Sequence, residues 1–107
     1  MSRCISVLGS TGSIGRQTLL VAEELGLRVA ALTAGRQIDL LEQQARRFRP
    51  CLVAVFEEPA ARALRERLGD TPIQVMSGME GLLAAASLPE ADTVVTAVMG
   101  SVGLEPT

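Results

Sequence analysis

Short apolar runs alternate with longer segments of mixed polarity along this chain. The runs are rich in Val, Ile, Leu and Ala, are too short for helices, and are bounded by turn-forming or charged residues. Buried strands typically show this pattern, which differs from the strict alternation of half-exposed strands. The runs predict strands at residues 4–8, 27–33, 51–56, 73–76 and 93–98.

The segments between the runs are expected to be helices, because their apolar residues recur at helical spacing. The first helix is expected from about Ile14 to Leu25, with Gly26 as its C-terminal stop. A second helix is expected to begin at Asp39 and to be ended by Pro50, and further helices are expected at about residues 59–68 and 77–87. The inner faces are predicted to consist of Ile14, Leu19, Val21, Ala22 and Leu25 in the first helix and Leu40, Leu41, Ala45 and Phe48 in the second.

Two of these helices open on the pattern of a capping box. Asp39 is followed three positions later by Glu42, and Ser77 by Glu80. In such a box the side chain of the first residue accepts a hydrogen bond from an amide of the first helical turn. We therefore expect the side chains of Asp39 and Ser77 to cap their helices.

Strands that alternate with helices through short connections are typical of an α/β fold with a parallel sheet. We expect a Rossmann-like, three-layer α/β/α domain with a mainly parallel sheet over residues 1–107. The first strand is expected to lie between the second and the last, so that the strand order reverses beside it. Ligands of such folds bind beyond the carboxyl ends of the strands at this reversal.

A glycine-rich loop follows the first strand, with glycines at positions 9, 12 and 15. Gly9 allows a sharp turn, Gly12 lets a diphosphate approach the backbone, and Gly15 lets the helix pack closely. The helix N-terminus supplies amide donors, so an anion can be held without a lysine. The hydroxyls of Thr11 and Ser13 are further donors.

This loop has two alternative interpretations. A P-loop of the ATPase type needs Lys and then Ser or Thr after the second glycine, and Arg16 and Gln17 stand after Gly15 instead. The other alternative is a glycine-rich turn that binds nothing. The position of the loop between a strand and a helix favours a dinucleotide site over this alternative.

The end of the second strand indicates which dinucleotide is bound. NAD-binding domains usually carry Asp or Glu there, for the ribose hydroxyls. This chain has Thr33, Ala34, Gly35, Arg36 and Gln37. Because no carboxylate repels a 2′-phosphate and Arg36 can bind one, NADP is favoured over NAD. The alternative is that Arg36 is a solvated surface charge.

The last expected strand leads into small residues, among them Ala97 and Gly100, with Met99 between them. In the expected topology this segment lies beside the glycine-rich loop. The nicotinamide half of the cofactor is then expected to pass close to its backbone, near Ala97 and Met99. A plain strand-terminating turn is the alternative.

The composition excludes several classes of function. A formal net charge of −2 gives no broad attraction for nucleic acid or an anionic membrane. No apolar run approaches the ~20 residues of a membrane span, and the first strand starts too early for a signal peptide, so a cytoplasmic protein is expected. Cys4 and Cys51 are expected to be buried free thiols. Because histidine is absent and the carboxylates do not cluster, no catalytic residue and no metal ligand is assigned to this chain.

Several strings of this sequence resemble the 1-deoxy-D-xylulose 5-phosphate reductoisomerase family. The resemblance covers the whole chain, and the strings agree with the family in order and spacing, which is more specific than the glycine loop alone. The strings are residues 5–15, 17–19, 31–36, 40–43 and 48–50, with Gly100, Gly103, Leu104 and Pro106 near the end.

The resemblance implies an NADPH-dependent enzyme of the non-mevalonate isoprenoid pathway. Such enzymes rearrange 1-deoxy-D-xylulose 5-phosphate and reduce the resulting aldehyde to 2-C-methyl-D-erythritol 4-phosphate, with magnesium or manganese bound to the substrate. The family contacts to the diphosphate carry over to Thr11, Gly12, Ser13 and Ile14. Those near the adenosine phosphate carry over to Gly35 and Arg36, and Gln37 stands where the family commonly has Asn.

The family is several times longer than this chain, and its metal-binding carboxylates, substrate-phosphate residues and lid lie beyond position 107. We therefore expect an N-terminal part that binds NADPH without turnover, with the remaining domains of the enzyme as partners. The alternatives are a free-standing regulatory dinucleotide-binding module, the NADP domain of another reductase, and a structural protein that dimerises through an exposed sheet edge.

Overall fold

The computed structural model describes residues 3–35, 37–89 and 91–96. Every expected strand and helix is present in this part, with ends that differ by one or two residues. The last strand is described as far as Thr96, and its expected end at 97–98 lies outside the described residues. The elements are β1 (Cys4–Leu8), α1 (Ser13–Leu25), β2 (Arg28–Ala34), α2 (Ile38–Phe48), β3 (Leu52–Val55), α3 (Glu58–Arg67), β4 (Gln74–Ser77), α4 (Gly78–Ala86) and β5 (Thr93–Thr96).

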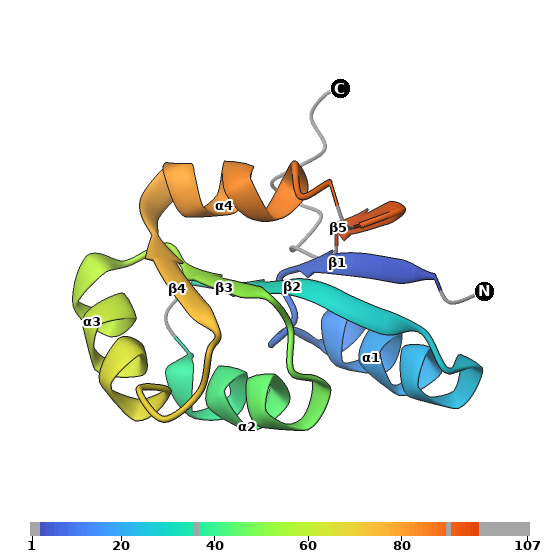
Figure 1. Ribbon diagram of the computed structural model, residues 1–107, viewed down its shortest axis with the longest axis horizontal. Coiled ribbons are helices and arrows are strands. Elements are labelled where there is room, and N and C mark those ends of the chain that lie inside the picture. Colours follow the sequence, from blue (N-terminus) through green and yellow to red (C-terminus); the bar gives the residue numbers. More distant parts are fainter. Residues whose placement is uncertain (1–2, 36, 90, 97–107) are drawn as a thin grey trace.

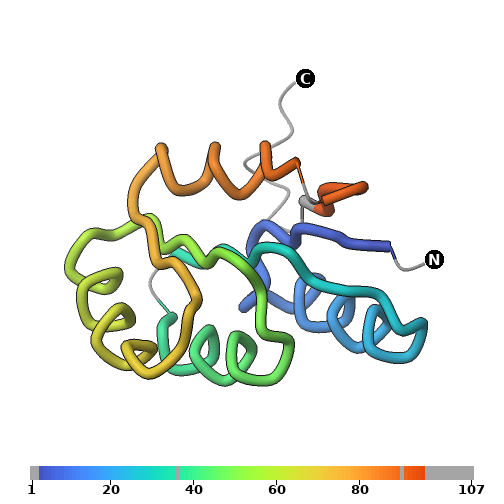
Figure 2. Tube along the Cα trace, viewed as in Figure 1, coloured from blue at the N-terminus to red at the C-terminus, as the bar shows by residue number. Residues whose placement is uncertain are grey.

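The strands form one parallel sheet in the order β4-β3-β2-β1-β5. Helices α1, α2 and α3 cover one face of the sheet and α4 covers the other (Figure 1). The chain runs outward from β1 to β4 and then returns through α4 to place β5 on the far side of β1 (Figure 2). The expected three-layer α/β/α fold and the reversal of strand order beside β1 are therefore confirmed.

The main core lies between the sheet and helices α1, α2 and α3. It is built from small and branched aliphatic side chains, such as Val7, Leu32, Leu41 and Leu64, all of them fully buried. A smaller cluster of Ala31, Leu52 and Ala85 lies on the α4 side. Because strands buried on both faces contact helices through both sets of side chains, β2 and β3 are almost continuously apolar.

The apolar stripe expected on the first helix is wrong in part. Leu19 and Ala22 are buried, but Ile14, Val21 and Leu25 are 57%, 49% and 67% exposed. These three residues lie about a quarter turn around the helix from the buried face, at 100° per residue. In α2, Leu41 and Ala45 are buried as expected, Leu40 and Phe48 only in part, and the polar Gln44 is buried with them.

Neither expected capping box forms. Gln37 occupies the N-cap position of α2, while Asp39 lies inside the first turn and pairs with Arg67 of α3. Ser77 is the N-cap of α4, but its hydroxyl donates to a Glu58 carboxylate oxygen of α3 rather than capping its helix. Asp39 and Ser77 are thus both engaged by charged side chains of α3, and neither side chain accepts a hydrogen bond from an amide of its own helix.

The expectation that the two thiols are buried is wrong. Cys51 is exposed and Cys4 is partly buried. Cys4 is the first residue of β1, and Cys51 directly precedes β3. Both therefore lie at the amino-terminal edge of the parallel sheet, where the strand ends are less covered than the strand centres.

Ion pairs connect the outer surfaces of α2 and α3. Arg67 of α3 pairs with Asp39 and Glu42 of α2. Arg46 of α2 donates to Glu42 of its own helix and to Asp70 just after α3, each at 3.1 Å. The hydrogen bond from Arg46 holds the pKa of the Asp70 carboxyl below its usual value. These groups are largely solvent-exposed, so each pair adds little to stability. The pairs do show that Arg46 and Arg67 have acidic partners on this surface.

Helix α1 starts very close to the end of β1, and Gly15 makes this approach possible. A Cβ atom on Gly15 would lie 2.2 Å from the Gly9 carbonyl oxygen and 2.6 Å from Ser10 Cα. Both neighbours are backbone atoms, so they cannot move aside as a flexible side chain can. The expected role of Gly15 in close packing is confirmed, and its neighbour is the turn itself.

Replacing Gly15 with Ala should therefore displace α1 and destabilise the fold by at least about 2 kcal/mol, in the range of overpacked cores. The matched control is Gly35→Ala, because a Cβ on Gly35 meets no heavy atom within 4 Å. Urea unfolding of the two variants measures the difference. Equal stability of Gly15→Ala and the wild type would contradict the close approach.

Candidate dinucleotide-binding site

The turn after β1 is held by the end of the neighbouring strand. The Gly9 amide donates to the carbonyl and hydroxyl oxygens of Thr33, at 3.1 and 2.9 Å. The Ser10 amide donates to the same carbonyl at 2.8 Å. Gly9 has a φ of 83°, which only glycine adopts readily. The sharp turn expected at Gly9 is therefore confirmed, and it directs the chain across the end of β1.

The N-terminus of α1 carries no acidic or capping side chain. Among the helices of the described residues, α2, α3 and α4 have Asp39, Glu58 and Glu80 in their first turns, and α1 has no acidic residue there. Its N-cap is Gly12, which forms no side-chain hydrogen bond. The first amides of a helix have no intrahelical acceptor. In α1 these amides and the positive end of the helix dipole are thus left for an external anion.

The backbone of Gly12 is ordinary, with φ of −81° and ψ of 175°. Any residue adopts this conformation, so the turn itself does not require glycine there. The lack of a side chain at position 12 instead leaves space in front of the helix. This is consistent with the expectation that a diphosphate approaches the backbone at Gly12.

The structure reveals a polar residue of this region that the sequence analysis did not single out. Gln44 of α2 is 7% exposed, and its side-chain amide forms two hydrogen bonds with Ser10. The sequence pattern could have identified this residue, because Gln44 falls on the expected inner face of the second helix, between Leu41 and Ala45. A glutamine at an inner position needs a buried hydrogen-bonding partner, and the turn supplies it.

The remaining expected site residues that the structure describes lie near the carboxyl ends of β1 and β2. Thr11 and Gly12 are half-buried, whereas Gly35 at the end of β2 and Gln37 before α2 are exposed. Leu8 pairs with Thr96, so the last described residue of β5 lies beside the end of β1. Ser13 and Ile14 are exposed at the start of α1, while Arg36, Ala97 and Met99 lie outside the described residues.

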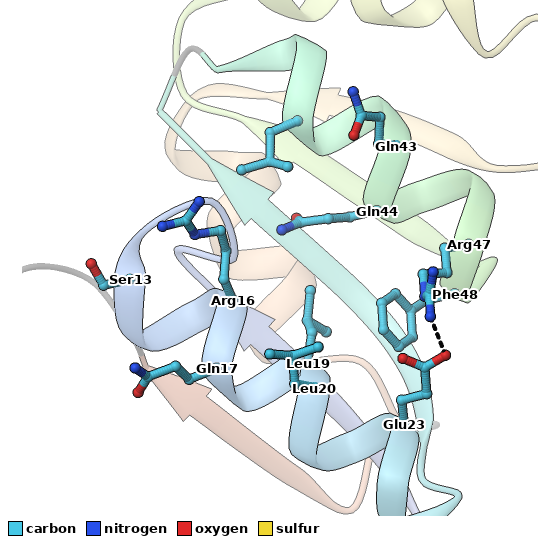
Figure 3. A pocket seen from close by; sticks show the side chains of 11 residues that line it. Ser13, Arg16, Gln17, Leu19, Leu20, Glu23, Gln43, Gln44, Arg47 and Phe48 are labelled. Atoms are coloured by element: carbon cyan, nitrogen blue, oxygen red, sulfur yellow. Dashed lines mark hydrogen bonds and ion pairs between the residues drawn. The ribbon is translucent and has the colours of Figure 1, made fainter.

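A groove of about 680 Å³ runs between α1 and α2, behind the turn (Figure 3). Ser13 and Arg16 line its end near the turn, and an ion pair between Glu23 and Arg47 lies near its other end. Gln44 points from α2 toward the turn in the same view (Figure 3). Thr11 and Gly12 do not line this groove, whereas Ser13 at the start of α1 does.

Within the described part of the chain, no cluster of His, Cys, Asp and Glu is arranged to hold a metal ion. The helices of that same part include none long and apolar enough to cross a membrane. The site consists of backbone amides, small side chains and hydroxyls, a donor set that suits an anionic ligand.

Sequence comparison places this site in a known family. The profile of the 1-deoxy-D-xylulose 5-phosphate reductoisomerase family matches residues 5–107. The chain belongs to this family. The reductoisomerase of Agathobacter rectalis is 51% identical over 104 residues, which are 96% of this chain and 27% of the relative. That of Ruminiclostridium cellulolyticum is 49% identical over 107 residues, all of this chain and 28% of the relative.

Solved reductoisomerases share the fold. A crystal structure of DOX-P reductoisomerase in complex with NADPH, fosmidomycin and magnesium matches 95% of this chain with a TM-score of 0.86 and 33% identity, over 26% of that chain. The reductoisomerase from Zymomonas mobilis in complex with NADPH matches 82% of this chain with a TM-score of 0.78 and 31% identity, over 24% of that chain. The chain thus spans about a quarter of the length of these reductoisomerases.

The open amides at the start of α1 predict a local response to a small diphosphate. Titration with inorganic pyrophosphate should shift the NMR amide signals of Thr11, Ser13 and Ile14. The Gly9 and Ser10 amides, which already donate to Thr33, should move less.

The start of α3 is the internal control for this titration, because Glu58 lies in its first turn and repels an anion. Its amide signals should stay in place at pyrophosphate concentrations that saturate the turn. Equal shifts at the starts of α1 and α3 would contradict a specific anion site.

Proposed function

We propose that residues 1–107 form a single domain that binds NADPH within a 1-deoxy-D-xylulose 5-phosphate reductoisomerase. The observation that carries this proposal is the uncapped N-terminus of α1, which lies beyond the carboxyl end of β1 where the strand order reverses. Rossmann-type domains bind a dinucleotide at this position. The family match and the two similar reductoisomerases solved with NADPH support the same ligand.

The proposed contacts divide into three groups along the cofactor. The diphosphate is bound at the turn and the start of α1, the adenosine 2′-phosphate at the end of β2, and the nicotinamide half beside the residues that follow β5. When bound, NADPH supplies a hydride, and the residues of this chain hold and orient it. The residues assigned to the three groups are Gly9, Thr11, Gly12, Ser13 and Ile14, then Gly35, Arg36 and Gln37, and last Ala97 and Met99.

The described residues fit this cofactor in shape and charge. The lack of a side chain at Gly12 and the first turn of α1, which holds no acidic residue, suit a diphosphate. No acidic residue lies between Thr33 and Gln37, so nothing in this stretch repels a 2′-phosphate. The exposed position of Gly35 leaves its backbone accessible to a ligand.

The activity of the whole enzyme is a wider proposal, because this chain matches only 27% of the length of the Agathobacter relative. We propose that the rearrangement and reduction of 1-deoxy-D-xylulose 5-phosphate need regions of the relatives that this chain does not match. The divalent cation, present as magnesium in three similar structures, is assigned to those regions. They are also the proposed protein partners of this domain.

Three expectations remain predictions from the sequence. They are a cytoplasmic location, the absence of nucleic-acid binding, and a homodimer formed through an exposed sheet edge. The edge strands of the described sheet are β4 and β5. Light scattering with and without NADPH separates the dimer from a domain that binds its cofactor as a monomer.

Calorimetry should show that this chain binds NADPH at least about tenfold more tightly than NADH, because a charge-assisted contact to the 2′-phosphate adds roughly 1.5–3 kcal/mol. Arg36→Asp should abolish or reverse this preference, since a carboxylate repels the 2′-phosphate and accepts hydrogen bonds from ribose hydroxyls. Arg62→Asp is the control, because Arg62 is exposed on α3 and pairs with Glu58 at 3.7 Å. Unchanged selectivity in Arg36→Asp would refute the assigned role of Arg36.

A second prediction concerns turnover. Mixing this chain with NADPH, magnesium and 1-deoxy-D-xylulose 5-phosphate should leave the absorbance of the reduced nicotinamide unchanged, although the cofactor binds. A full-length reductoisomerase serves as the positive control. Measurable NADPH oxidation by this chain would show that it carries catalytic groups of its own.

A further inference from the structure

The side chain of Gln44 connects helix α2 to the turn after β1. Its Nε2 donates to the Ser10 carbonyl oxygen at 2.8 Å, and its Oε1 accepts from the Ser10 hydroxyl at 2.7 Å. Ser10 is fully buried, and Gln44 is 7% exposed. Both polar ends of one side-chain amide are thus satisfied by a single residue of the turn, away from bulk water.

Ser10 is held from two further directions. Its amide donates to the Thr33 carbonyl of β2 at 2.8 Å. On the α1 side, a Cβ on Gly15 would lie 2.6 Å from Ser10 Cα, so no gap separates the helix from the turn. Contacts from α1, β2 and α2 therefore converge on Ser10 and fix the backbone that leads into Thr11 and Gly12.

The same contacts flank the segment assigned to the adenosine phosphate. Thr33 precedes Gly35–Gln37 in the chain, and Gln44 follows it on the first turns of α2. Both residues bond to the turn that is assigned to the diphosphate. The position of the turn relative to the end of β2 and to α2 is consequently fixed by these two residues.

We infer that Gln44 is a positioning residue that holds the diphosphate turn in register with the adenosine-phosphate segment. This inference rests on the proposed binding of NADPH. A fully satisfied buried polar network specifies one arrangement of the groups it joins. A preorganised site loses less freedom when its ligand binds. Gln44 thus lets the two anionic ends of the cofactor bind to one rigid unit rather than to two independent loops.

The test compares a ligand that spans both segments with one that reaches a single segment. NADPH spans both, whereas adenosine 2′-monophosphate carries only the 2′-phosphate end. Gln44→Leu removes both hydrogen bonds at similar volume and should weaken NADPH binding about tenfold or more, as expected for the loss of buried hydrogen bonds. The affinity for adenosine 2′-monophosphate should change less than about twofold, because this ligand does not reach the turn that Gln44 holds.

Two controls separate positioning from general loss of stability. Gln43→Leu changes the neighbouring, exposed glutamine of α2 and should leave both affinities unchanged. Leu64→Ala removes a fully buried side chain of α3 and destabilises the core without a contact to the turn. It should leave the ratio of the two affinities at the wild-type value. Ser10→Ala keeps the bond from Gln44 to the carbonyl and should give an intermediate loss of NADPH affinity, which provides a milder variant if Gln44→Leu does not fold.

Each outcome of these titrations decides between the two proposals. A selective loss of NADPH affinity in Gln44→Leu and Ser10→Ala supports the positioning role. Wild-type NADPH affinity in both variants overturns the positioning role, and so does an equal loss of affinity for both ligands. Neither outcome contradicts the proposal that the domain binds NADPH. If the wild-type chain itself does not bind NADPH, the proposed function fails and the inference fails with it.

Discussion

The close approach between Gly15 and the Gly9 carbonyl places the start of α1 directly over the end of β1. This steric constraint determines the rest of the site. With the helix at this distance, its free amides face the point where the strand order reverses. The turn must then bend sharply, which the positive φ of Gly9 allows. Thr33 accepts hydrogen bonds from the backbone amides that the turn would otherwise leave unpaired.

Charge is arranged locally in this protein. The chain as a whole is slightly acidic, with a formal net charge of −2, so its overall field does not attract an anion. Acidic residues stand at the N-termini of α2, α3 and α4, and two of them, Asp39 and Glu58, are engaged by groups on neighbouring elements. The α1 terminus lacks such residues. The N-terminus of α1 is therefore suited to an anion through the lack of acidic residues in its first turn rather than through a cluster of cations.

Agreement between sequence and structure depends on the range of the interaction. The strand β1 and the turn at Gly9 were predicted closely, because both depend on local features. These features are a short apolar run and a glycine that can adopt a positive φ. The capping roles of Asp39 and Ser77 were predicted wrongly, because Arg67 and Glu58 on α3 compete for these side chains. The predicted apolar face of α1 included residues that are exposed, because periodicity alone does not tell which apolar residues the sheet covers.

The sequence by itself determined the order of the elements, the parallel α/β class and the place of the glycine-rich turn, because these follow from local periodicity and from the conformational freedom of glycine. The order and spacing of several short motifs in this sequence also indicated the family. Only the tertiary structure decided that Gln44 and Thr33 meet at Ser10, and that Ile14 and Val21 face outward. Those outcomes depend on distances between segments that lie more than twenty residues apart in the chain or on which face of a helix meets the sheet. Such relations arise from packing, and no single stretch of residues encodes them.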